Sequence, residues 1–114
     1  MKIAIGVVLG LIVLWLIARQ VIAAKNRIAG AEAHERVRAG AVLLDVRTAA
    51  EYAQNRIEGA VNIPVSELRT RIGEIPKDSA VVVYCHSGMR SSAAARVLRR
   101  AGYEAHDLGP RSAW

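Results

Sequence analysis

The sequence is poor in the residues on which several kinds of function depend. Its 114 residues include one cysteine, three histidines and no phenylalanine. A single cysteine excludes an intrachain disulfide and fits a reducing compartment. The cysteine and the histidines are scattered without the spacing of metal ligands, so we expect no bound metal. Aromatic residues make up 4% of the chain and do not alternate with its basic residues, so we expect no nucleic-acid binding.

Charge is missing from residues 3–18, although the chain as a whole carries a net charge of +6. Extended to residue 24, this apolar run would form a helix about 33 Å long, which is enough to cross the hydrocarbon core of a bilayer. We therefore predict a transmembrane anchor at residues 1–24 and a juxtamembrane linker at 25–31. The alternative is a cleaved signal peptide, with Lys2 as its basic start and Val21-Ile22-Ala23 as its cleavage site. The length of the run favours the anchor.

Basic residues are distributed unevenly about this apolar run. Lys2 alone precedes it, and the basic residues that follow it closely are Arg19, Lys25, Arg27, Arg36 and Arg38. The positive-inside rule then predicts a single-pass membrane protein whose soluble domain lies on the cytoplasmic side. In the alternative, cleavage of a signal peptide would export the domain. The basic stretch also favours contact with a lipid bilayer that carries anionic headgroups.

Beyond the linker, short apolar runs alternate with helical patterns. Buried strands are predicted at residues 41–44, 80–83 and 104–108, with a short strand at 60–62. Helices are predicted at 31–39, 66–75 and 91–101. Thr48 and Glu51 have the spacing of a capping box for one more helix. This alternation predicts an α/β fold, a small parallel β-sheet flanked by helices with right-handed crossovers.

The single cysteine, Cys85, lies just after the predicted strand at 80–83 and before the predicted helix at 91–101. Ligands of open α/β sheets bind at such strand ends, and a thiol ionises more readily beside a helix N-terminus and cationic side chains. Gly88 allows the loop to turn so that successive N–H groups line an anion-binding cup. Arg90 adds positive charge at its rim, and Ser91 is a good N-cap.

We interpret residues 85–91, called the Cys85 loop below, as a cradle for an anionic sulfur species on Cys85. The alternative is a buried structural cysteine in a strand-to-helix turn, because cysteine is among the most buried residue types. The presence of Gly88, Arg90 and Ser91 at their spacing from Cys85 favours the cradle.

Three blocks of the sequence resemble one known family. The pattern Cys-x-x-Gly-x-Arg-Ser after an apolar strand is similar to the active-site loop of the rhodanese-like sulfurtransferases. Residues 43–47, 51–52 and 56–64 are similar to the family's first signature, and residues 102–103, 108–109 and Trp114 are similar to its ending. The resemblance covers residues 32–114, which we expect to form one rhodanese-like domain. Arg56 stands where the family usually has histidine, and Pro110, which has no backbone donor, stands where it usually has glycine.

The resemblance implies a sulfurtransferase that needs no cofactor. Cys85 would be the catalytic nucleophile and would carry the sulfur as a covalent persulfide. The donor would be thiosulfate or another sulfane-sulfur compound, and the acceptor would be cyanide, a thiol or a protein. Asp45 and Arg47 would support the site as scaffold. The loop backbone and the Arg90 side chain would bind the donor, which involves His86, Ser87, Gly88, Met89, Arg90 and Ser91.

Two other functions remain open from the sequence. A membrane-tethered sulfur carrier or binding module would keep the fold but pass its persulfide only to a dedicated partner. A cysteine-dependent phosphatase or arsenate reductase would use a similar cradle. In related phosphatases, however, the loop between the cysteine and the arginine is one residue longer than the four residues between Cys85 and Arg90.

His86 is a candidate base for the thiol, although we expect it at the pocket rim because adjacent side chains on such a loop point apart. We expect His34 to be a solvated helix residue.

Overall fold

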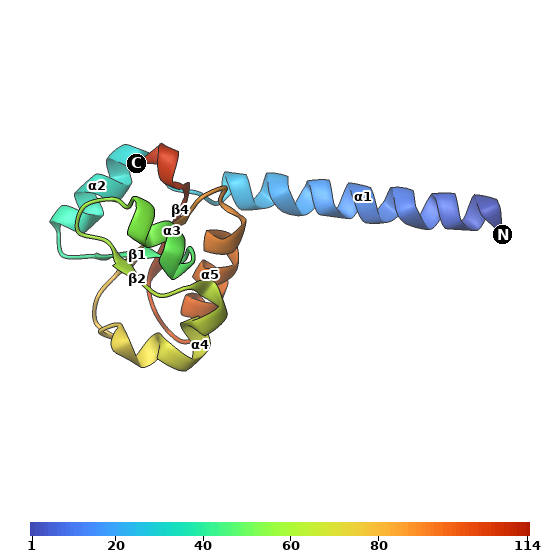
Figure 1. Ribbon diagram of the computed structural model, residues 1–114. Coiled ribbons are helices and arrows are strands. Elements are labelled where there is room, and N and C mark those ends of the chain that lie inside the picture. The colour runs from blue at the N-terminus through green and yellow to red at the C-terminus, as the bar shows by residue number, and fades with distance from the viewer.

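A long N-terminal helix projects from a small α/β domain in the computed structural model of the protein (Figure 1). The structure describes the backbone of residues 1–114 and the side chains of residues 1–22 and 25–114. The helix, α1, extends over Lys2–Lys25. Its segment Lys2–Ile22 is long and apolar enough to cross a membrane, and none of that segment is buried in the protein. The predicted apolar helix is therefore present, and it contributes nothing to the core of the domain.

The domain is built on a parallel sheet of four strands in the order β2-β1-β3-β4. These strands are β1 (Val42–Asp45), β2 (Val61–Asn62), β3 (Val81–Cys85) and β4 (Ala105–Pro110). The predicted parallel α/β fold is confirmed. Parallel strands end at the same edge of a sheet, so the ends of β1, β3 and β4 bring Asp45, Cys85 and Pro110 to that edge.

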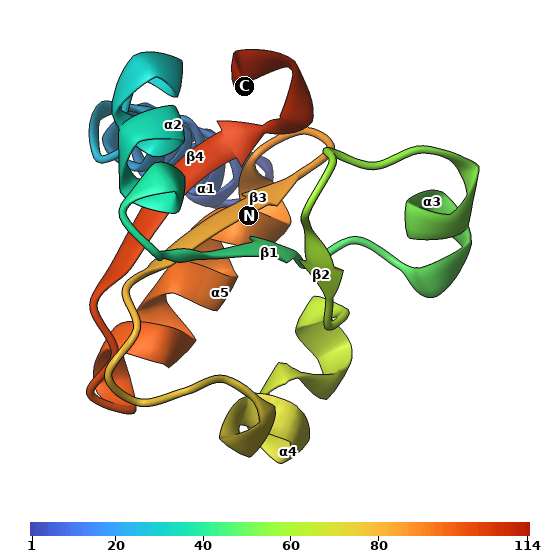
Figure 2. The ribbon, with the colours of Figure 1, turned by 90° about the vertical axis from the view of Figure 1, so that its left-hand side faces the viewer.

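Helices cover both faces of the sheet (Figure 2). The α-helices of the domain are α2 (Gly30–Arg38), α3 (Ala49–Gln54), α4 (Leu68–Arg71) and α5 (Met89–Arg100). Alternate residues of β3 serve the two faces, since Val81, Val83 and Cys85 pack with α4 and α5, whereas Val82 and Tyr84 pack with α2. Each fully buried valine contributes about 1.5–3 kcal/mol to stability. Cys85 thus faces α5.

One helix prediction and the predicted bounds of the linker need correction. The helix predicted at 66–75 is broken into a 3₁₀ turn at Val65–Glu67, α4, and a second 3₁₀ turn at Ile72–Glu74. Pro76 disfavours helical angles at the residue before it, and Ile75 is extended. The linker predicted at 25–31 is shorter, because α1 continues to Lys25 and α2 begins at Gly30. Within it, the Ile28 N–H donates to the carbonyl of Asp107 at 2.9 Å and fastens the chain to β4.

The expectation of a solvated His34 is wrong. Its ring stacks on Trp114, with the ring centroids 3.6 Å apart. The Nε2 atom of His34 also lies 2.9 Å from the Trp114 carbonyl oxygen. The C-terminal segment returns to α2 (Figure 1), so a residue that helical periodicity assigns to solvent is covered by the far end of the chain.

Candidate active site

Cys85 is the last residue of β3, and its side chain is fully buried. The Gly88 N–H donates to the Cys85 Sγ atom at 2.9 Å, and the thiol lies 3.5 Å from the Ser91 Oγ atom. The Cys85 loop therefore turns back over the sulfur and directs a backbone donor at it. Such a donor favours a negative charge on the sulfur.

Gly88 makes this turn because its φ angle is +99°, in the left-handed region that favours glycine. It is also the N-cap of α5, which begins at Met89, so the expectation that Ser91 would cap this helix is wrong. Ser91 lies in the first turn instead, where its hydroxyl donates to the Gly88 carbonyl at 3.1 Å. The N–H groups of a first helical turn lack helical partners, and the positive end of the α5 dipole lies beside the sulfur.

His86, Ser87 and Met89 line the outside of the loop, and their side chains are exposed. Within the part of the chain that the structure describes, His86 makes no hydrogen bond to Cys85. The geometry thus brings the Gly88 backbone and the Ser91 hydroxyl to the sulfur and leaves the imidazole outside.

Arg90 is held by an ion pair with Glu51 of α3. The two guanidinium nitrogens of Arg90 lie 2.6 and 3.0 Å from the two carboxylate oxygens of Glu51. The same carboxylate completes the predicted capping box with Thr48. Hydrogen bonds from Arg90, and then from the Thr48 N–H, lower the pKa of Glu51 to about 2. The pKa of Arg90 is raised, first by its hydrogen bonds to Glu51 and then by the charge of that carboxylate.

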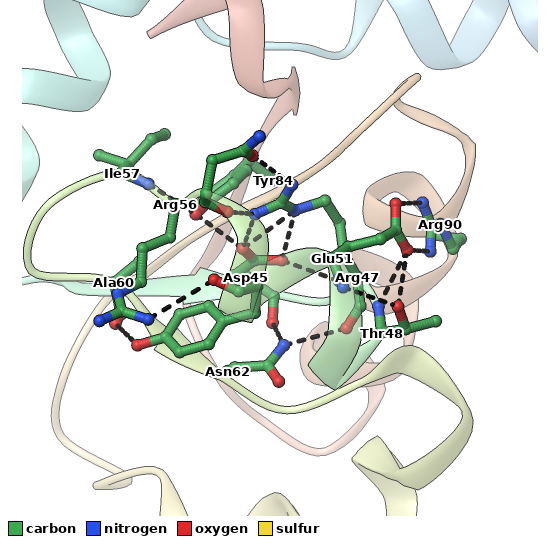
Figure 3. A network of polar contacts seen from close by, with 12 residues as sticks. Asp45, Arg47, Thr48, Glu51, Arg56, Ile57, Ala60, Asn62, Tyr84 and Arg90 are labelled. Carbon is green, nitrogen blue, oxygen red and sulfur yellow. Dashed lines mark hydrogen bonds and ion pairs between the residues drawn. The ribbon is translucent and has the colours of Figure 1, made fainter.

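Asp45 and Arg47 form a second, buried pair (Figure 3). Arg47 Nη2 lies 2.7 Å from Asp45 Oδ2 and donates to the Asn55 carbonyl at 2.6 Å. The Tyr84 hydroxyl donates to Asp45 at 2.8 Å and accepts from the Ile57 N–H at 3.2 Å. Burial is the main reason that the pKa of Tyr84 is raised to about 12.

Asp45, Arg47 and Glu51 lie close together in the sequence but belong to two separate networks. Asp45 and Arg47 bind Tyr84 of β3 and the segment after α3, whereas Glu51 binds the Cys85 loop through Arg90. The sequence places Asp45 and Glu51 close together but contains no signal that Glu51 pairs with a residue 39 positions away. The pair forms because the fold places α3 beside the start of α5, and the sequence alone does not show this placement.

The two departures from the family pattern lie in different places. Arg56 is exposed, and its guanidinium stacks 4.5 Å from the centroid of the Tyr52 ring. Pro110 lies in β4 in register with Cys85. The neighbouring Gly109 N–H donates to the side chain of Asp107 at 2.8 Å. Of these two residues, only Pro110 therefore lies beside β3, the strand that ends in Cys85.

Arg27 is a further residue at the loop, although the sequence places it in the linker. Its side chain lies against Gly88 and Gly109, so that a Cβ atom at Gly109 would be 2.6 Å from Arg27 Nε. This Nε atom is buried and has no hydrogen-bond partner among the described residues. Its distance from Cys85 along the chain gives no signal of this contact, which depends on the linker being fastened to β4.

Comparison with known proteins identifies the kind of domain that this chain forms. Residues 29–108 match the rhodanese-like domain family. A sulfurtransferase from Allochromatium vinosum is 47% identical over 62 residues, which are 54% of this chain and 58% of that protein. Thiosulfate sulfurtransferase PspE of Escherichia coli is 40% identical over 62 residues, which are 53% of this chain and 60% of that protein. The match thus spans about three fifths of the length of each of these relatives.

A solved structure agrees with the sequence matches. A rhodanese with anions from E. coli superposes with a TM-score of 0.62 at 32% identity, covering 66% of this chain and 92% of that one. The parallel sheet, the cysteine at the end of β3 and the matched residues 29–108 point the same way. The chain belongs to the rhodanese-like domain family, whose relatives include sulfurtransferases.

Proposed function

We propose that the protein transfers sulfane sulfur from a donor such as thiosulfate to a nucleophilic acceptor, cyanide or a thiol, through a persulfide on Cys85. The observation that carries the proposal is the loop geometry, in which the Gly88 N–H points at the buried Cys85 Sγ at the N-terminus of α5. The relatives named as sulfurtransferases support the same class of reaction.

The first half-reaction forms the persulfide. The Cys85 thiolate attacks the outer sulfur of thiosulfate, a new sulfur–sulfur bond forms, and the donor's own sulfur–sulfur bond breaks. Sulfite leaves with the electron pair of the broken bond, and the outer sulfur stays on Cys85 with its negative charge. The thiolate is itself the nucleophile, so the step needs no separate base, which agrees with an exposed His86.

The second half-reaction returns the enzyme to its starting state. The acceptor attacks the terminal sulfur, and the bond to Cys85 breaks with its electron pair returning to the thiolate. No net oxidation or reduction of the protein occurs over the cycle. The two half-reactions share one covalent intermediate and predict ping-pong kinetics.

The loop stabilises the charge on the terminal sulfur in the way that an oxyanion hole stabilises oxygen. Donors fixed before the reaction cost no reorganisation, and removing one lowers turnover about 10²–10³-fold in comparable sites. Gly88 already supplies one N–H to the sulfur. Arg90 is held at the side of the loop by Glu51, which offsets part of its charge.

We further propose that Lys2–Ile22 anchors the protein in a membrane with the domain on the cytoplasmic side. The segment is apolar and unburied, and the basic residues cluster after it. A reduced Cys85, which the reaction requires, agrees with a cytoplasmic domain.

Steady-state kinetics of the full-length protein in detergent would test the sulfur transfer. We expect thiocyanate from thiosulfate and cyanide, with the parallel double-reciprocal lines of a ping-pong mechanism. Cys85→Ser should abolish the product, and Ser66→Ala, a change at an exposed position outside the Cys85 loop, should not.

The same preparation distinguishes the other functions. Hydrolysis of an aryl phosphate that Cys85→Ser abolishes, without thiocyanate formation, would identify a phosphatase and overturn the proposal. A persulfide that accumulates on Cys85 without turnover by small acceptors would instead identify a carrier.

A further inference from the structure

A cavity of about 510 Å³ lies between the C-terminal part of α1 and the start of α5. Arg19 of α1, Arg27 of the linker and Arg96 of α5 line it, and we call it the arginine cavity. Among the described residues that line it, none is a carboxylate. Three arginine residues thus line one hollow, and the guanidinium of Arg19 also lies 4.8 Å from the centroid of the Trp15 ring.

The three arginines have no ionic partner among the side chains that the structure describes. Over the described side chains, no carboxylate oxygen lies within 4.0 Å of Arg19, Arg27 or Arg96. Arg27 Nε is buried without a hydrogen-bond partner in this part of the chain, which is an unfavourable state for a donor. The Nη2 atom of the same guanidinium lies beside Gly88, which lines the cavity, so an anion there would meet this end of Arg27. Arg90 on the other side of the loop differs, because it already forms an ion pair with Glu51.

One acidic residue, Asp107, lines a smaller neighbouring cavity of about 150 Å³, which also contains Arg99 and shares Arg19, Ser92 and Arg96 with the arginine cavity. Burial raises the pKa of Asp107, and the charges of Arg27 and Arg99 act in the opposite direction. Its carboxylate accepts a hydrogen bond from the Gly109 N–H at 2.8 Å. Asp107 is thus engaged with β4 and does not line the arginine cavity.

The arginine cavity is amphipathic and lies at the end of the apolar segment. Leu16 and Met89 give it an apolar side, and Ser92 adds a hydroxyl. Lys2–Ile22 has 21 residues and is therefore about 32 Å long as a helix, close to the thickness of a bilayer's hydrocarbon core. With this segment across a bilayer, Arg19 lies within one helical turn of its end, and its long side chain can reach the lipid headgroups by snorkelling.

We propose that the arginine cavity binds the phosphate group of an anionic phospholipid. The proposal rests on the membrane span proposed above and is independent of sulfur transfer. Ser87, Gly88 and Met89 of the Cys85 loop line the same cavity. A bound headgroup therefore touches the loop and holds the candidate active site against the membrane surface.

Native mass spectrometry of the full-length protein in detergent tests this site. We expect phosphatidylglycerol to bind at least about tenfold more tightly than phosphatidylcholine of the same chain length, because only the former is anionic. Arg27→Gln and Arg96→Gln should each weaken phosphatidylglycerol binding about fivefold, the effect of one basic residue near a membrane surface. The matched control is Arg100→Gln, an exposed arginine of α5 outside the cavity, which should change binding little.

Inorganic phosphate, added as a competitor, separates the two sources of a phosphate group. We expect millimolar phosphate to leave the phosphatidylglycerol adduct in place. If phosphate instead displaces phosphatidylglycerol when the two are present at equal concentrations, the cavity binds free anions and the lipid assignment is overturned. Equal binding of the two lipids, or an equal loss in Arg27→Gln and Arg100→Gln, would overturn the site altogether. Circular dichroism of each variant checks that its fold is retained, and Arg96→Gln, at an exposed position, keeps the test decisive if Arg27→Gln unfolds.

Discussion

Glu51 has two roles at the scale of single residues. It completes the capping box of α3 with Thr48 and pairs with Arg90 of the Cys85 loop. One carboxylate therefore couples the start of α3 to the loop, and both interactions favour its ionised form. Since its side chain is 32% exposed, the pair contributes in the range of a surface ion pair, about 0.2–1 kcal/mol.

The lowered pKa of Glu51 predicts how stability depends on pH. A carboxyl group whose pKa falls from 4.5 to about 2 on folding stabilises the folded state above pH 4.5. That contribution is lost as the pH falls from 4.5 toward about 2. Glu51→Gln should therefore be less stable than the parent by about 1 kcal/mol at pH 7, and the difference should shrink below pH 4.5.

Urea unfolding at several pH values measures this difference. Glu58→Gln is the control, because Glu58 is exposed and forms no ion pair with any described residue. A difference between Glu51→Gln and the parent that stays constant down to pH 2 would contradict the assignment.

A second prediction concerns Tyr84 and the stability that its buried hydrogen-bond network provides. Tyr84→Phe removes the donor to Asp45 and leaves the buried Ile57 N–H without an acceptor. We expect a loss of about 1–3 kcal/mol in the free energy of unfolding. Tyr52→Phe removes a hydroxyl that donates to the Ala60 carbonyl from a half-buried position, and it should cost less. Both losses are measured by urea unfolding. Equal losses in the two variants would contradict the larger contribution that we assign to the buried Tyr84 network.

At the scale of elements, the loop between β3 and α5 depends on Gly88. An alanine there must adopt a φ of +99°, and its Cβ atom would collide with the guanidinium of Arg27. We expect Gly88→Ala to fold but to lose at least about tenfold in sulfur transfer, because the displaced N–H no longer points at Cys85 Sγ.

Gly40→Ala is the matched control for this change. Gly40 has a φ of +108° with open space around it, so alanine there brings the backbone strain without touching the loop. Strain of this kind costs about 1–2 kcal/mol, and it should leave the thiocyanate rate unchanged. A Gly88→Ala enzyme as active as Gly40→Ala would contradict the role of the Gly88 N–H.

The same elements show how far sequence reasoning reaches. Continuous apolar runs identify β1 and β3, since parallel strands are buried on both faces, and the capping-box spacing identifies the start of α3. Serine is a good N-cap, so the sequence predicts the start of α5 at Ser91, whereas the left-handed Gly88 caps the helix earlier. Propensity alone does not reveal which of two capping residues the loop geometry selects.

At the scale of the whole molecule, the sequence does not reveal the contacts between segments that lie far apart along the chain. Arg19, Arg27 and Arg96 come from α1, the linker and α5, and no spacing relates them. The pairing of Glu51 with Arg90 and of His34 with Trp114 has the same origin. Composition predicts the apolar helix and the charge beside it, but only the folded chain brings those charges to the Cys85 loop.

The proposed membrane anchor makes a prediction at this scale. Because Lys2–Ile22 is apolar and unburied, the full-length protein should stay in the membrane fraction after an alkaline carbonate wash. Its intact mass should correspond to the uncleaved chain. A soluble form whose mass lacks the residues before the Val21-Ile22-Ala23 site would instead identify a cleaved signal peptide.

The intact mass of the full-length protein after incubation with thiosulfate tests the central claim most directly. We predict a product heavier by one sulfur atom, absent from Cys85→Ser and reversed by cyanide. This result would establish the Cys85 persulfide and leave the physiological partners to be identified. No gain in mass, or an equal gain in Cys85→Ser, would contradict sulfur transfer from thiosulfate through Cys85.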